Sequence, residues 1–214
     1  MRQILKIEGW EPEELTAWKR ANPCGRYQEL GNSRGGELAR KAIRRDAIKE
    51  QFGLCGYCCK SINLENSTNE HVISQQSDRN QTLNFANIIA SCNKKSRCNQ
   101  ARGAKELALT PLMPECETEL KFYLSGKVEG KTERASAAIG ALALDNRAIQ
   151  DERKQLVDVL IYTNTGSQPS ELELLGDELL NDLISTLDKP DDSGILPPYS
   201  PALINIIRGF LNES

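Results

Sequence analysis

The chain has 214 residues, of which 39% are hydrophobic and 27% are charged, the ordinary balance of a globular protein that can bury a core. No apolar run approaches the roughly 18 residues that a membrane-spanning helix needs, and the N-terminus lacks the apolar stretch of a secretion signal. We therefore expect a cytoplasmic protein that does not enter a membrane. The net charge of −3 is uneven, because residues 151–214 carry −8 and residues 1–150 carry +5. The first part can thus present a basic face to a polyanion, unless the difference is only ordinary variation in surface charge.

The first half of the chain is predicted to combine helices with two short strands. In chain order we expect a helix at 11–20, a loop at 22–36, a helix at 37–51, strands at about 69–73 and 87–91, and a helix from about Cys98 to Ala108. The helix at 37–51 carries a basic stripe formed by Arg40, Lys41, Arg44, Arg45 and Lys49. Gly53 is expected to end that helix.

The second half is predicted to be mostly helical after one hairpin. We expect a hairpin at 119–130 that turns at Ser125 and Gly126, two helices within 132–162 that break near Asp145 and Asn146, a polar linker at 163–170, an acidic helix at 171–187, a loop at 189–201 and a short helix at 202–212. The chain is accordingly divided into an N-terminal helical segment (1–53), a cysteine and histidine segment (54–110), a hairpin with helices (111–162) and an acidic C-terminal region (163–214).

Four of the seven cysteines form two local pairs. Without a secretion signal, disulfides are not the first interpretation. Cys55 and Cys58 enclose two residues, and Cys92 and Cys98 form the second pair. Four thiolates would complete a tetrahedral structural zinc site. The gap between Cys92 and Cys98 is wider than usual, Cys59 leaves a choice of ligand, and small buried core residues are the other interpretation.

His71 is the only histidine in the chain. A zinc ion that ties residue 55 to residue 98 would bring both ends of this segment close to it. Glu70 precedes it in a predicted strand, where adjacent side chains point to opposite faces and need not do the same job. Asn87 follows 16 residues later and Asn99 directly follows Cys98. A single histidine is more often structural than catalytic, so both roles stay open on these grounds.

The order of these residues resembles HNH endonucleases with a four-cysteine zinc finger, and most closely the PtuB-like nucleases of Septu and retron anti-phage defence systems. The motifs "LCGYC", "EHV", "NFANIIASC" and "RCNQARG" carry the resemblance. Downstream, "TPLMPECETELKFYLSGKV" and "AAIGALALDNRAIQDER" are similar to the family's proline-rich loop with hairpin and to its following helical segment. The resemblance covers about residues 36–162, and residues 163–214 are not placed by it.

The resemblance implies an α+β fold, predominantly helical, with a small zinc-stabilised ββα-metal core at 54–110 and a β-hairpin after it. It further implies that His71 is the general base, that Asn87 holds the histidine loop, and that Glu70 and Asn99 bind a catalytic divalent ion such as Mg²⁺. Cys55, Cys58, Cys92 and Cys98 would hold the structural Zn²⁺. This division agrees with ligand chemistry, since oxygen donors suit a hard ion, thiolates suit zinc, and a neutral imidazole can accept a proton near pH 7.

The expected substrate is nucleic acid, with DNA favoured over RNA. Lys94, Lys95, Arg97 and Arg102 flank the predicted site and would contact phosphates without sequence preference, or else form a solvated surface. The resemblance implies a PtuA-like ABC-type ATPase as partner, and in some systems a retron reverse transcriptase with its RNA–DNA. The family's proline three residues after the histidine is Ser74 here, and an expected lysine is Arg102. The alternatives are a catalytically inactive zinc-stabilised adaptor of the same complex, and a metal-storage or redox protein.

Overall fold

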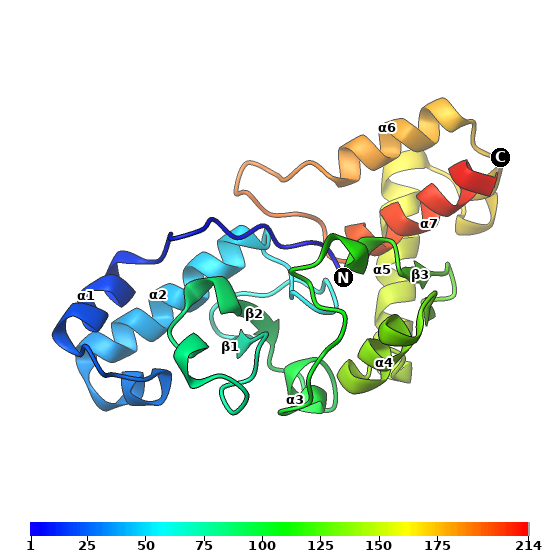
Figure 1. The fold of residues 1–214 in the computed structure, drawn as a ribbon. Helices are drawn as coiled ribbons and strands as arrows, with labels where there is room; N and C mark the ends of the chain where they lie inside the picture. Colours follow the sequence, from blue (N-terminus) through cyan, green and yellow to red (C-terminus); the bar gives the residue numbers. More distant parts are fainter. Residues whose placement is uncertain (214) are drawn as a thin grey trace.

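The structure is a computed structural model that describes residues 1–213, and its fold is mixed α+β with two small antiparallel sheets (Figure 1). The helices are α1 (Glu13–Ala21), α2 (Arg34–Glu50), α3 (Asn99–Arg102), α4 (Glu133–Leu142), α5 (Arg147–Thr165), α6 (Asp177–Leu187) and α7 (Ser200–Glu213). The strands are β1 (Ser67–His71), β2 (Ile88–Cys92), β3 (Leu120–Phe122) and β4 (Val128–Gly130). Short 3₁₀ helices are η1 (Tyr27–Asn32), η2 (Arg79–Gln81), η3 (Phe85–Asn87), η4 (Pro114–Glu117) and η5 (Pro169–Leu174).

Three predicted boundaries were wrong. The loop expected at 22–36 contains η1 and the start of α2, because the Ser33 side chain accepts a hydrogen bond from the Gly36 amide at 3.1 Å and caps the helix. The helix expected from Cys98 to Ala108 ends at Arg102, since Gly103 adopts a φ of 58°. The acidic helix expected at 171–187 is divided into η5 and α6 by extended backbone at Leu175.

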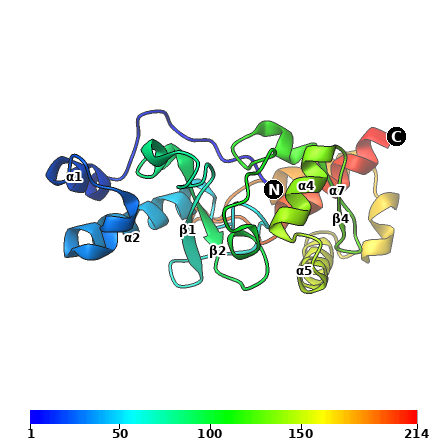
Figure 2. The ribbon, with the colours of Figure 1, turned by 60° about the horizontal axis from the view of Figure 1, so that its bottom comes forward.

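β1 and β2 form an antiparallel hairpin in which His71 pairs with Ile88 and Ser67 with Cys92. Side chains alternate between the two faces of β1. Glu70 and Thr68 contact α3, where they meet Arg102 and Asn99. The opposite face is turned to the N-terminal helices, since Asn69 donates to a carbonyl of α2 and His71 packs against η1. Figure 2 shows α2 beside this hairpin. The two sides of β1 therefore lie in different surroundings.

Helices α4 to α7 group with β3 and β4 to one side of this hairpin, and one hydrophobic core runs through both parts (Figure 1). β3 and β4 lie against α7 and α4, and the Asn205 side chain of α7 accepts a hydrogen bond from the Phe122 amide at 2.9 Å. Gly126 turns this hairpin at a φ of 79°, and a Cβ there would meet the Gln150 carbonyl oxygen at 2.1 Å, so only glycine fits. Core residues come from all parts of the chain between Met1 and Ile207. Within residues 1–213, every helix is too short or too polar to cross a bilayer.

Candidate functional site

The cysteines of the two predicted pairs meet at one buried point. The sulfur atoms of Cys55, Cys58, Cys92 and Cys98 lie within 4.8 Å of one another. The Cys55–Cys98 and Cys58–Cys92 separations are both 3.9 Å. Zinc binds thiolate at about 2.3 Å, so the sulfurs of a tetrahedral site lie about 3.8 Å apart. The spacing and the chemistry of the four donors therefore suit a metal ion such as zinc.

Local backbone geometry explains why this cluster forms despite the wide second pair. Cys55 opens a tight knuckle, in which its amide donates to the Lys60 carbonyl at 2.8 Å and its carbonyl accepts from the Cys59 amide at 3.0 Å. Between Cys92 and Cys98 the chain reverses at Ser96, with a φ of 60°, and Cys98 itself has a φ of 54°. These two left-handed residues fold the five intervening residues back on themselves.

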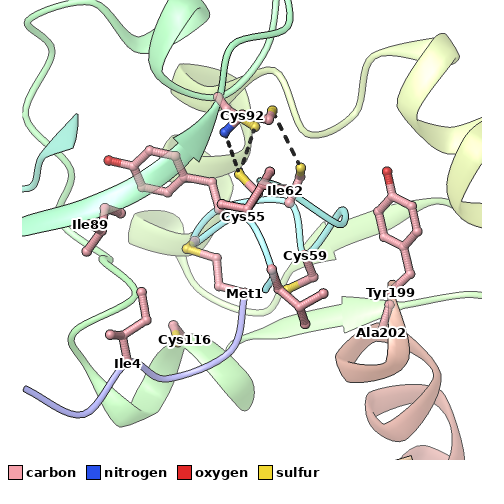
Figure 3. Packing of buried hydrophobic residues seen from close by; sticks show 14 of the residues in the cluster. Met1, Ile4, Cys55, Cys59, Ile62, Ile89, Cys92, Cys116, Tyr199 and Ala202 are labelled. Carbon is pink, nitrogen blue, oxygen red and sulfur yellow. Dashed lines mark hydrogen bonds between the residues drawn. The ribbon is translucent and has the colours of Figure 1, made fainter. Parts of the chain in front are cut away.

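The structure also resolves the choice between Cys58 and Cys59. Cys58 belongs to the cluster, while Cys59 is buried but lies outside the group formed by Cys55, Cys58, Cys92 and Cys98 (Figure 3). Cys116 is likewise buried outside the cluster, and Cys24 is exposed.

His71 ends β1 and is 6% exposed. Its Nε2 lies 2.9 Å from the Thr82 carbonyl oxygen. Because a carbonyl can only accept, Nε2 carries the proton and Nδ1 of the neutral ring keeps the lone pair. Burial lowers the pKa of His71, and the charge of Arg102 lowers it further. The hydrogen bond to Thr82 raises this pKa but does not cancel the effect of burial. The ring is therefore a neutral imidazole at pH 7, and the Tyr27 ring packs edge-on against it at 4.6 Å between centroids.

Asn87 clamps the loop that follows the histidine. Its Oδ1 accepts from the Ile73 amide at 2.7 Å and its Nδ2 donates to the Ile73 carbonyl at 2.9 Å. A third, longer hydrogen bond of 3.3 Å joins Nδ2 to the Gln81 carbonyl. The side chain is 4% exposed, so these bonds are not exchanged for water. This contact is the one that the predicted loop-holding role requires.

Glu70 is held by a buried cation. Its Oε1 accepts hydrogen bonds from Arg102 Nη1 at 2.7 Å and from the Tyr57 hydroxyl at 3.0 Å. Burial raises the pKa of the Glu70 carboxyl, and the charge of Arg102 lowers it again. One carboxylate oxygen is thus oriented by the protein, and Oε2 is the atom left to meet a ligand.

Asn99 lies at the start of α3, beside the same face of β1. Its Nδ2 donates to the Thr68 hydroxyl at 2.7 Å, which fixes the orientation of the amide. Its Oδ1 is buried and has no hydrogen-bond partner among the residues described. A buried oxygen without a donor is costly. A cation beside it would remove this cost.

The four predicted phosphate contacts divide into two groups. Lys94 and Lys95 are exposed in the loop after β2. Arg97 is 7% exposed and pairs with Glu152 at 2.9 Å, and Arg102 is 2% exposed. These two arginines were also predicted to contact nucleic acid, but their guanidinium groups are buried and bonded inside the protein, so Lys94 and Lys95 are the exposed members of the set.

Sequence reasoning missed the residues that support His71 and Asn99. Thr82 and Tyr27 contact His71 from segments without a motif, so no sequence signal marks them. Thr68 could have been found, because it shares the strand face of Glu70 at a spacing of two residues. Neither a scan against models of protein families nor a search of curated proteins found a match for this chain. The geometry described above is therefore the ground on which a function is proposed.

Proposed function

We propose that the chain is a metal-dependent endonuclease of the HNH type that hydrolyses phosphodiester bonds of nucleic acid. The observation that carries the proposal is the geometry of His71. It stands at the end of β1 in a hairpin followed by α3, with Nε2 held by the Thr82 carbonyl and the lone pair of Nδ1 left as a base. A neutral, oriented imidazole is what abstraction of a proton from water requires.

The neighbours of His71 then have defined roles. The Thr82 carbonyl stabilises the imidazolium that forms when Nδ1 takes the proton, because it accepts a hydrogen bond from Nε2 in both charge states. Asn87 fixes the peptide groups of Ile73 and so keeps the loop after the histidine in one position. Proton transfer depends on such fixed geometry.

We assign a hard divalent ion such as Mg²⁺ to Glu70 and Asn99, which meet on the side of β1 that faces α3. Asn99 Oδ1 is the buried oxygen without a donor, and Glu70 contributes its second carboxylate oxygen from the adjacent strand position. Both are oxygen donors of the kind that Mg²⁺ prefers. A bound ion would supply electrostatic stabilisation of the leaving 3′ oxygen. Arg102 and Tyr57 keep the Glu70 carboxylate in place for that purpose.

The four-cysteine centre is assigned a structural Zn²⁺ that takes no part in the chemistry. It joins the knuckle at 55–58 to the end of β2 and the start of α3. All four ligand positions are filled by thiolates, so no open position is left for a substrate. Its place between these elements makes it the support of the hairpin that carries His71.

The proposed partner is an ABC-type ATPase that controls the nuclease, and the acidic C-terminal region is the surface assigned to it. Exposed carboxylates gather on η5 and α6, at Glu171, Glu173, Asp177, Glu178 and Asp182. Because Tyr199 and Leu203 of this region pack in the core, its deletion would damage the fold. Replacing the five acids by their amides is the cleaner test, and unchanged ATPase binding would refute the assignment.

A second candidate is a zinc-stabilised adaptor without catalysis. Two observations favour it: Glu70 Oε1 is already occupied by Arg102 and Tyr57, and His71 is only 6% exposed. In that case the hairpin would serve as a rigid surface for nucleic acid or the ATPase.

Substitution of His71 separates the two candidates. For the nuclease, His71→Ala abolishes cleavage of DNA and RNA in the ATPase complex while zinc content and fold persist, and added imidazole restores part of the rate. Ser74→Ala, three residues away, serves as the control and retains cleavage. A His71→Ala protein that cuts as fast as the wild type would show that the base is assigned wrongly.

A further inference from the structure

Arg153 of α5 is a buried cation without an anionic partner. It is 1% exposed, its guanidinium donates to the Gly126 and Leu144 carbonyl oxygens, and it lies over the Phe122 ring at 5.0 Å from the centroid. Its Nε has no partner, and no carboxylate of residues 1–213 forms an ion pair with it. An uncompensated buried charge is strongly unfavourable, so the fold must hold a counter-charge nearby.

The four-cysteine centre is the neighbouring group that can supply this charge. The C-terminal end of α4 is hydrogen-bonded both to the cysteine centre and to Arg153. The Leu142 carbonyl accepts from the Cys98 amide at 2.8 Å, and the Leu144 carbonyl accepts from the Arg153 guanidinium at 3.2 Å. Burial lowers the pKa of Arg153, and Tyr199, Cys58 and Cys59 raise it again. The Tyr199 amide in turn donates to the Cys59 carbonyl at 2.9 Å, which joins the start of α7 to the residue that follows Cys58.

Several cations near the cluster suit a metal–thiolate centre of negative charge. A zinc ion with four thiolates carries a net charge of −2, since the ligands must be deprotonated. Lys60 and Arg97 share the Glu152 carboxylate, and Arg153 is the third cation. Three cations and one carboxylate leave +2, which is the opposite of the charge on the centre.

We propose that Arg153 is the charge-compensating residue of the metal–thiolate centre, so that the docking of α5 on the core depends on the bound metal ion. The proposal rests on the zinc site of the proposed function, but not on nuclease activity. Loss of the ion disturbs the charge and the packing of the centre beside Arg153, and α5 then separates from the core before the rest of the chain unfolds. Conversely, loss of the arginine charge lowers the affinity of the four-cysteine centre for its metal ion.

Metal affinity of the full-length protein tests this coupling. Co²⁺ is titrated into the metal-free protein, and its thiolate absorption band reports occupancy of the four-cysteine site directly. Arg153→Met is expected to weaken Co²⁺ binding by about tenfold or more, the usual effect of losing a group that supports metal ligands. Arg153→Lys keeps the charge and should bind within a few-fold of the wild type. Arg147→Met, on the same helix but exposed and paired with Asp151, is the matched control and should not change affinity.

Hydrogen exchange on the wild type provides a second readout that does not depend on the variant folding. Amides of α5 should lose protection when the metal is removed by a chelator, while those of α1 keep theirs. Equal Co²⁺ affinity of Arg153→Met and wild type, or unchanged exchange in α5 after chelation, overturns the proposal and leaves the zinc site standing. If the wild type binds neither Co²⁺ nor Zn²⁺, the zinc site itself fails and the proposal fails with it.

Discussion

Replacing Arg102 by methionine tests whether this residue holds the site together or contacts nucleic acid. Its guanidinium donates to Glu70 Oε1, to the Tyr57 hydroxyl and to the carbonyl oxygens of His71, Val72 and Lys105, at 2.6 to 2.9 Å. Methionine fills a similar volume but makes none of these bonds. The Glu70 side chain, 13% exposed, is then left as a buried charge without a cation.

The expected loss follows from that unpaired carboxylate. Removing one partner of a buried ion pair costs about 3–5 kcal/mol, because the remaining charge stays desolvated. Urea unfolding followed by circular dichroism measures this as a lower midpoint with an unchanged slope. Arg102→Lys should recover only part of the loss, since an ammonium group has three donors and cannot serve five acceptors. Adding Glu70→Gln to Arg102→Met should restore some stability, because the buried charge is gone.

Two results would refute this reasoning. The first is an Arg102→Met protein whose stability is within about 0.5 kcal/mol of the wild type, the range expected for a surface residue. The second is a double variant no more stable than Arg102→Met, which would show that the carboxylate is not the source of the loss.

Two further predictions follow from the contacts of the histidine loop and of the loop after β2. Asn87→Ala should lower the free energy of unfolding by about 1–3 kcal/mol, because it leaves the backbone groups of Ile73 without their partners. Hydrogen exchange of the amides in residues 72–82 should also become faster. Unchanged exchange in these residues would contradict the proposed role of Asn87 in holding the loop. Lys94→Ala combined with Lys95→Ala should reduce the slope of log K against log salt for DNA binding by about 2. Removing the same charge at Lys127 and Lys189 should leave the slope unchanged, and equal slopes for both double variants would exclude this loop as a phosphate contact.

Local patterns in the sequence were sufficient to predict the parts of the site that neighbouring residues determine. Spacing predicted the two cysteine pairs, and apolar runs predicted the strands around His71 and Ile88. A capping residue predicted the helix break before Asn146. Each of these features is present in the structure. The mixed α+β class and the hairpin at β3–β4 are confirmed in the same way. The nuclease core and the catalytic ion stay predictions.

The rest of the site depends on contacts between distant segments, which spacing does not encode. Arg102 was interpreted as an exposed cation because its sequence neighbours are basic, yet its acceptors include the carbonyl of His71, the last residue of β1, 31 residues earlier. Arg153 reads as one charge among many on an amphipathic helix, and only the packing of α5 shows that it is buried. The helices of residues 163–214 were predicted in outline, but their docking was not, because it depends on distant contacts such as the bond from the Tyr199 amide to the Cys59 carbonyl.

Cleavage by the wild-type protein tests the central proposal most directly. Zinc-loaded full-length chain is incubated with its ABC-type ATPase, Mg²⁺ and either supercoiled DNA or RNA, and the products are resolved on gels. The nuclease proposal predicts cuts that require the added divalent ion and that leave 3′-hydroxyl and 5′-phosphate ends, so that nicked DNA is resealed by a ligase. Intact DNA and RNA in every divalent ion tried, from a protein that retains its zinc and its fold, would contradict the proposal and favour the adaptor.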